Sequence, residues 1–209
     1  MDSFKLFVAL LALVNPLGAV PIFISLTQQH TRAERKKTIA TAAISVGVVI
    51  VVSGILGEQI IGFFGISIGS LQVGGGLIIL LTALNMLNAR SGGARSTPEE
   101  ESEAETKPNI GVVPLAIPFM TGPGAISTVI VYAHNMHGWL QYLGLLLSAA
   151  VMAALVMLAL SMAGSIARLL GQTGINVATR LMGLILSALA VEIIANGLVR
   201  LLPALGPVG

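Results

Sequence analysis

The sequence predicts an all-α integral membrane protein of six transmembrane helices, arranged as two inverted three-helix repeats in which helices 1 and 4 are broken. Composition is the first indication: 55% of the 209 residues are hydrophobic and only 10% are charged, whereas soluble domains carry about 25% charged residues. Apolar runs of membrane-spanning length are the second. Prolines and glycines that interrupt the first and fourth of these runs are the third.

The six spans follow from the thickness of the bilayer. About 20 apolar residues at ~1.5 Å each cover ~30 Å of hydrocarbon, and such runs must be helical because an isolated strand leaves backbone groups unpaired there. The first run lacks the basic flank of a signal peptide, so we expect it to be a span. In chain order, the expected spans are Phe4–Thr27, Thr38–Phe63, Ile66–Leu87, Ile110–Ala133, Trp139–Leu169 and Ala178–Leu202.

Lys and Arg are concentrated on one side of the predicted membrane domain. Nine of the 11 lie between spans 1 and 2, between spans 3 and 4, or where spans 5 and 6 meet; Lys5 and Arg200 lie toward the other side. Because cytoplasmic loops collect Lys and Arg, we expect both termini to be periplasmic or extracellular. The expected location is a bacterial inner (plasma) membrane.

Internal similarity divides the chain into two repeats. We predict a first three-helix repeat at 1–88, an acidic, flexible cytoplasmic linker at 89–109 and a second three-helix repeat at 110–209. Gly65-Ile66 matches Gly174-Ile175, and Gly74 matches Gly183. Because each repeat has an odd number of spans, the second enters the membrane from the opposite side, as in many secondary transporters.

The first and fourth spans are expected to be broken helices. Proline removes an amide donor and glycine relaxes the backbone, and the freed groups suit the charged ends of a substrate. Matching breaks in two repeats indicate a substrate site, whereas ordinary proline kinks are the alternative. The predicted substrate-binding residues are Asn15, Pro16, Gly18, Thr121, Gly122 and Gly124.

Polar residues within the other spans are predicted to carry a coupling ion or to line the cavity. Glu192 lies near the middle of span 6, where a carboxylate is expensive and usually functional or paired. Asn196 lies one turn further along the same face, and Gln72 and Asn85 lie in span 3. Hydrogen bonding between helices is the alternative role. No Lys or Arg is expected at the depth of Glu192.

Other chemistry is not expected. The chain has no Cys, which excludes disulfides and thiolate metal sites. His134 and His137 share an external turn with no carboxylate expected nearby, so we predict no metal site. Gly65-Ile-Ser-Ile-Gly69 matches a hydrolase nucleophile motif but joins two apolar runs instead of a strand and a helix. We therefore expect no enzymatic activity, no cofactor and no nucleic-acid binding.

Four segments together resemble the MarC family of six-span inner-membrane proteins of bacteria and archaea. They are Asn15–Thr27, Gly74–Gly76, Pro118–Ser127 and Arg180–Glu192. One branch of that family is described as transporting small neutral amino acids such as glycine and alanine. The resemblance therefore implies an amino-acid carrier in the lipid bilayer, driven by an H⁺ or Na⁺ gradient.

We accordingly predict a secondary transporter, an exporter or exchanger, that alternates access around a midplane site at the broken helices. Two alternatives remain open: a drug or metabolite exporter of the same fold, and a non-transporting scaffold or signalling subunit that uses the acidic linker. The sequence leaves open the exact substrate, the direction of transport, the coupling ion and whether the chain forms a homo-oligomer.

Overall fold

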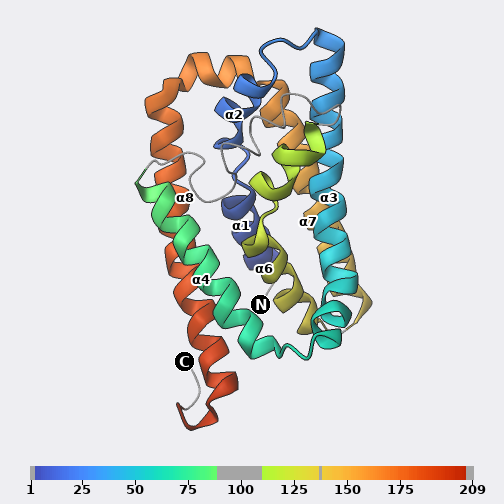
Figure 1. The fold of residues 1–209 in the computed structure, drawn as a ribbon, viewed down its shortest axis with the longest axis vertical. Coiled ribbons are helices and arrows are strands. Elements are labelled where there is room, and N and C mark those ends of the chain that lie inside the picture. Colours follow the sequence, from blue (N-terminus) through green and yellow to red (C-terminus); the bar gives the residue numbers. More distant parts are fainter. Residues whose placement is uncertain (1–2, 89–109, 137, 206–209) are drawn as a thin grey trace.

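The computed structural model describes residues 3–88, 110–136 and 138–205, and within these ranges the chain forms helices and no strands (Figure 1). The predicted linker at 89–109 and His137 lie outside the described residues. The elements in chain order are α1 (Ser3–Val14), α2 (Ala19–Leu26), α3 (Arg32–Phe63), α4 (Ile68–Leu87), η1 (Gly111–Met120), α6 (Pro123–His134), α7 (Trp139–Ser161), α8 (Ala163–Leu201) and η2 (Pro203–Leu205).

The structure contains four helices that are long and apolar enough to cross a membrane by themselves, namely α3, α4, α7 and α8. The pair α1 and α2 adds a fifth candidate span, bent by 43° at its break. The fourth predicted span forms no continuous α-helix, because η1 is a π-helix with extended backbone at Val113 and Ile117. The described residues therefore give an all-helical membrane protein with four or five candidate spans.

Helix α3 begins six residues before the predicted start of its span because of a capping box. Glu34 accepts a hydrogen bond from the backbone N–H of Thr31 at 2.7 Å, and the Thr31 hydroxyl accepts one from the N–H of Glu34 at 3.3 Å. These bonds satisfy amide donors that the first helical turn leaves free. The Thr-x-x-Glu pattern thus fixes where the helix begins.

The boundary between predicted spans 5 and 6 was wrong. Helix α7 ends at Ser161 and α8 begins two residues later. The backbone turns at Gly171, where φ is 60° and ψ is −179°, a conformation that is essentially restricted to glycine. The first part of α8 therefore lies across the upper end of the molecule in Figure 1, and the rest descends along its length.

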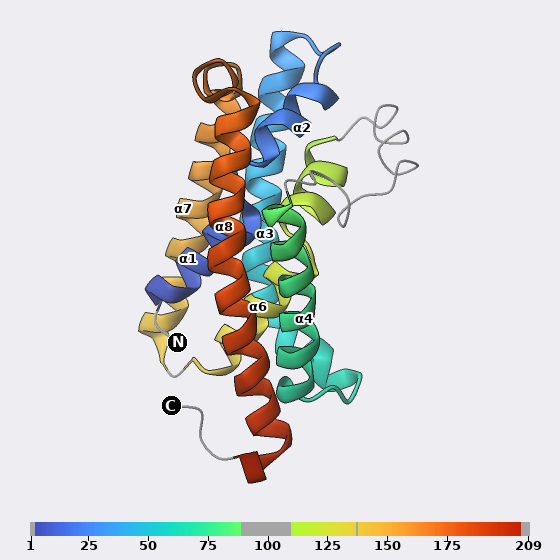
Figure 2. The same ribbon diagram turned by 90° about the vertical axis from the view of Figure 1, so that its left-hand side faces the viewer.

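Helices at corresponding places in the two halves pack against each other. The most extensive contact joins α4 to α8, the next joins α3 to α7, and α1 contacts α6. The colours in Figure 1 show that each pair is antiparallel, and Figure 2 shows α4 alongside α8 from a second direction.

Glycines allow α4 and α8 to approach closely. A Cβ at Gly183 would lie 2.9 Å from the carbonyl oxygen of Ala83, and one at Gly197 would lie 2.8 Å from the Cβ of Gln72. Gly74, which the repeat comparison matched to Gly183, has no such contact: a Cβ there would meet nothing within 4 Å. The two matched glycines therefore have different roles in packing.

The core lies where α1, α2, α6 and η1 are enclosed by the longer helices. Apolar side chains remain exposed on the long helices, as expected for surfaces that meet lipid rather than water. Fully buried side chains include Leu10, Phe23, Ile50, Met120 and Leu186. Exposed apolar side chains include Val48, Leu81, Leu147 and Leu184.

Candidate functional site

The first break separates α1 from α2 at Asn15, Pro16 and Gly18. Asn15 has a positive φ of 44°, a conformation that Asn tolerates better than most residues. A residue that precedes proline is also disfavoured in the helical region. The Asn15 side chain is 6% exposed, and its Oδ1 accepts a hydrogen bond from the N–H of Gly18 at 3.2 Å. The side-chain amide oxygen of Asn15 thus accepts a hydrogen bond from one of the backbone amides that the break leaves free.

The second break separates η1 from α6 at Thr121 and Gly122. The N–H and the hydroxyl of Thr121 both donate to the carbonyl oxygen of Ala116, at 2.8 and 2.7 Å. Thr121 is 1% exposed. Pro123 follows as the first residue of α6, a position that has no need of an amide donor. The hydroxyl therefore stabilises the end of η1.

The two breaks lie close to each other. Gly124 at the start of α6 is buried, and a Cβ there would lie 3.4 Å from Leu13 near the end of α1 and 3.0 Å from Ile79 of α4. A Cβ at this position would be in ordinary van der Waals contact with Leu13 and in a tight contact with the Ile79 side chain. The start of α6, next to the second break, thus lies beside the end of α1, next to the first break, where α1 and α6 lie side by side (Figure 1).

A polar cavity of about 490 Å³ lies among α1, α4, α6 and α8. Its charged lining residues are Lys5 of α1 and Glu192 and Arg200 of α8. Its uncharged polar lining residues are Gln72, Tyr132, Asn135 and Asn196. We call this set of seven residues, with the space that they enclose, the polar cavity.

The polar cavity is separated from the breaks along the helix axes. Lys5 precedes Asn15 by ten residues on α1, and Tyr132 follows Gly124 by eight residues on α6; at ~1.5 Å per residue these separations are ~15 and ~12 Å. Three of the four polar residues predicted to line the site, Gln72, Glu192 and Asn196, are thus brought together, but at a distance from the breaks. Asn85 does not line the polar cavity.

Similarity to known proteins identifies the family. The pattern described as "MarC family integral membrane protein" matches residues 2–202. The chain belongs to the MarC family. It is 43% identical to UPF0056 membrane protein YhcE of Escherichia coli, over 97% of this chain and 94% of that protein. It is 39% identical to UPF0056 membrane protein YvbG of Bacillus subtilis, over 95% of each chain.

The MarC resemblance noted in the sequence is therefore confirmed. A UPF0056 membrane protein of the archaeon Archaeoglobus fulgidus is 33% identical, over 93% of this chain and 91% of that protein. No solved structure matches the chain. The relatives' names establish an integral membrane protein and give no substrate.

Two cations of this MarC chain, Lys5 and Arg200, line the same polar cavity as Glu192; the expectation that no Lys or Arg lies at the depth of Glu192 stays a prediction. Arg200 lies eight residues after Glu192 on α8, with Asn196 midway, and Lys5 comes from the start of α1. The i, i+4, i+8 spacing on α8 was visible in the sequence. Lys5 was not predictable in this way, because its place depends on how α1 packs on α8.

Hydrogen bonds hold part of the cavity lining in place. Nη2 of Arg200 donates to Oδ1 of Asn135 at 2.8 Å, and Nδ2 of Asn135 donates to the carbonyl oxygen of Val131 at 2.7 Å. The guanidinium is therefore tied to the end of α6. Among the atoms that the structure describes, the buried Oε1 of Gln72 has no hydrogen-bond partner.

The expectation that no carboxylate lies near His134 was wrong. Nδ1 of His134 lies 2.9 Å from Oε1 of Glu58 on α3, so a carboxylate does lie nearby. The pair joins the last residue of α6 to α3. Within the described ranges, no three His, Cys, Asp or Glu side chains gather as a metal site would require.

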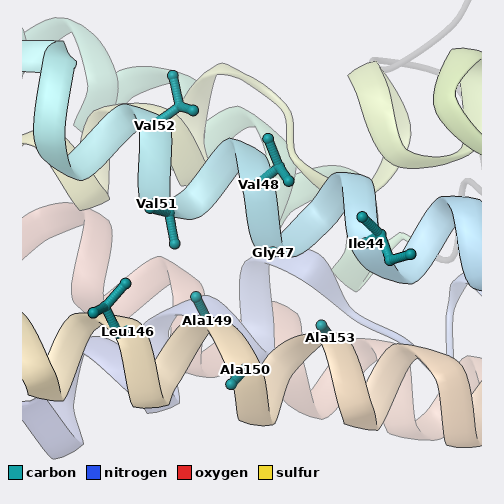
Figure 3. Close-up of a pocket in the computed structure, with 9 residues that line it drawn as sticks. All are labelled: Ile44, Gly47, Val48, Val51, Val52, Leu146, Ala149, Ala150 and Ala153. Atoms are coloured by element: carbon teal, nitrogen blue, oxygen red, sulfur yellow. The ribbon is translucent and has the colours of Figure 1, made fainter.

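A second hollow in the MarC structure is apolar. It has a volume of about 370 Å³, and its lining comes from α3 and α7 (Figure 3). Its lining includes the larger Ile44, Val48 and Leu146 and the small Gly47, Ala149 and Ala153. With no polar side chain in its lining, this groove offers nothing to orient a charged substrate.

Proposed function

We propose that the protein is a secondary transporter of small neutral amino acids such as alanine and glycine, and a carrier rather than an enzyme. The observation that carries the proposal is that two interrupted helices, one from each half of the chain, meet at Gly124 and Leu13. Broken helices that face each other expose amide and carbonyl groups, which suit the carboxylate and ammonium of a zwitterion.

The topology proposed for this carrier has six spans in two inverted repeats. The pair η1 and α6 would be the fourth, broken span, equivalent to α1 and α2. Antiparallel packing of α3 on α7 and of α4 on α8 supports this arrangement. The distribution of Lys and Arg supports a bacterial inner-membrane location with both termini periplasmic.

Alternating access is the proposed mechanism. One half would rock against the other around the breaks, so that the site opens to each side in turn, and an H⁺ or Na⁺ gradient would drive the cycle. A small substrate is favoured because Gly18, Ala19, Gly124 and Ala125 surround the breaks and the two alanines are at most 4% exposed. A drug-sized molecule would need a wider space there.

The experiment that tests the proposal is counterflow of labelled alanine and glycine in proteoliposomes. The parent protein is expected to exchange both. Thr121→Ala removes the hydroxyl that bonds to Ala116, so the rate should fall at least about tenfold, whereas Thr121→Ser should retain most activity. If the folded parent exchanges no small amino acid under any gradient, the amino-acid proposal is wrong.

A further inference from the structure

The end of α6 bonds to two long helices, one from each half of the chain. Nδ1 of His134, the last residue of α6, lies 2.9 Å from Oε1 of Glu58 on α3. The next residue, Asn135, accepts a hydrogen bond through its Oδ1 from Nη2 of Arg200 on α8 at 2.8 Å. We call these two contacts the α6 clasp, because together they hold the end of α6 between α3 and α8.

Both contacts of the α6 clasp are exposed. The side chain of His134 is 34% exposed and that of Glu58 is 54% exposed, and the bond from Arg200 to Asn135 is exposed as well. Glu58 and Arg200 both lie in the last two turns of their helices, so the clasp is near one end of the bundle. Because water and ions compete for exposed polar pairs, each contact is weak by itself and can break and re-form.

The other end of α6 adjoins a break in the backbone. Helix α6 begins at Pro123, directly after the break at Thr121 and Gly122, so no continuous α-helix connects it to η1. Its 12 residues are ~18 Å long and join the break to the clasp. Residues at the ends of helices are where hinges occur in proteins. A break at one end and weak contacts at the other therefore suit a helix that changes its tilt as a unit.

The α6 clasp borders the polar cavity. Val131, Tyr132 and Asn135 line the cavity from the α6 side, and Arg200 lines it from α8. The hydrogen bond between Arg200 and Asn135 therefore connects two walls of the cavity near the end where both helices stop. Separation of these two side chains would widen the cavity toward that end of the bundle.

We propose that the end of α6 is a gate to the polar cavity and that the α6 clasp holds this gate closed. Loss of the bond between Arg200 and Asn135 releases one wall of the cavity, and loss of the contact between His134 and Glu58 lets α6 tilt about the break. In the proposed transport cycle the gate opens the periplasmic side, and this role rests on the proposed function. The movement itself can be measured without transport.

Thiol labelling of the purified full-length protein in lipid nanodiscs tests the gate, since both membrane faces are then open to the reagent. The reporter is Asn196→Cys, which places a thiol in the cavity lining of a chain with no Cys of its own. His134→Ala and Glu58→Ala, each added to the reporter, should raise its rate of reaction with a bulky hydrophilic maleimide about two- to fivefold, as the loss of one exposed pair predicts. The matched control is Gln59→Ala, at an exposed neighbour of Glu58, which should leave the rate unchanged.

A double variant distinguishes the contact from general loosening of the fold. If the two side chains act through each other, His134→Ala and Glu58→Ala together should raise the labelling rate no more than either does alone. Thermal unfolding in the same nanodiscs shows whether each variant is folded. Increases that multiply in the double variant, or single variants that label as slowly as the reporter alone, would overturn the proposal.

Reversible cross-linking gives a second measurement that needs no loss of a contact. Glu58→Cys and His134→Cys, bridged by a short cleavable methanethiosulfonate linker, fix the end of α6 to α3. Alanine counterflow should then fall at least about tenfold and return when the linker is cleaved. Full counterflow in the bridged protein would contradict the gate. If the parent exchanges no alanine, the labelling experiment still decides the gate, so failure of the amino-acid proposal is distinguishable from failure of this one.

Discussion

Asn15 has two properties at the first break that neither glycine nor alanine would provide together. Its backbone has a positive φ, and its side chain caps the N–H of Gly18 at 3.2 Å. Glycine shares the first property and has no side chain for the second. Alanine offers neither, because its Cβ makes positive φ unfavourable by about 1–2 kcal/mol. Helix α1 therefore ends at Asn15-Pro16 for two reasons: Asn15 has a positive φ, and Pro16 has no amide N–H to donate.

A pair of substitutions at this residue separates backbone from side chain. Asn15→Gly keeps the positive φ, so its thermal unfolding in detergent should lie close to that of the parent. Asn15→Ala should unfold at a lower temperature, because it should lose about 1–2 kcal/mol of stability. If Asn15→Gly also loses amino-acid counterflow while remaining folded, the side chain itself serves transport. If Asn15→Ala is as stable as Asn15→Gly, the conformational explanation is wrong.

At the scale of elements, the contact between α4 and α8 depends on glycines that have no room for a side chain. The neighbour of Gly183 is backbone, the carbonyl oxygen of Ala83, which cannot rotate away as a flexible side chain does. An added methyl group must therefore displace one helix from the other. Gly76 is similar, since a Cβ there would lie 3.2 Å from the carbonyl oxygen of Ala190.

Alanine substitutions at different glycines of these two helices should therefore have very different effects on the stability of the protein. Gly183→Ala is expected to destabilise the protein by about 1–3 kcal/mol, because overpacking forces the backbone to shift. Gly74→Ala is expected to be neutral or slightly stabilising, since alanine favours helix more than glycine does. Thermal unfolding of both variants in the same detergent checks this. Equal effects would mean that α4 and α8 are further apart than the structure shows.

The sequence predicted those elements whose signal is local. Long apolar runs gave α3, α4 and α7, and the proline and glycine clusters gave both breaks. The break at Met162 and the turn at Gly171 were missed because they depend on backbone conformation, which hydropathy does not report. Lys5 and Arg200 were assigned to the opposite side from most cations, and the spacing of Arg200 from Glu192 was visible in the sequence. That Lys5 lines the same cavity depends on how α1 packs on α8, which one sequence does not indicate.

At the scale of the whole molecule, the arrangement of the helices predicts which loops share a side of the membrane. The link between α2 and α3 lies at the upper end in Figure 1, and the link between α3 and α4 lies at the lower end, where α8 also ends. Because α3 joins these two links and is long enough to span a bilayer, they should face opposite compartments.

Single cysteines test this orientation without further engineering, because the chain has none of its own. Phe64→Cys, in the link before α4, should react with an impermeant maleimide added outside intact cells. Gln29→Cys, in the link before α3, should react only after the cells are opened. The parent protein, which has no thiol, is the control. The reverse pattern would contradict the orientation derived from Lys and Arg.

The short connection from α7 to α8 has a mechanical consequence. A single residue, Met162, separates the two helices, and the chain then continues as helix until it turns at Gly171. A link of one residue leaves little backbone freedom between α7 and the first part of α8. The direction of the descending part is therefore set at Gly171, where φ is 60°. Any residue with a side chain would be strained in that conformation, so the angle between the two parts of α8 depends on a glycine at this position.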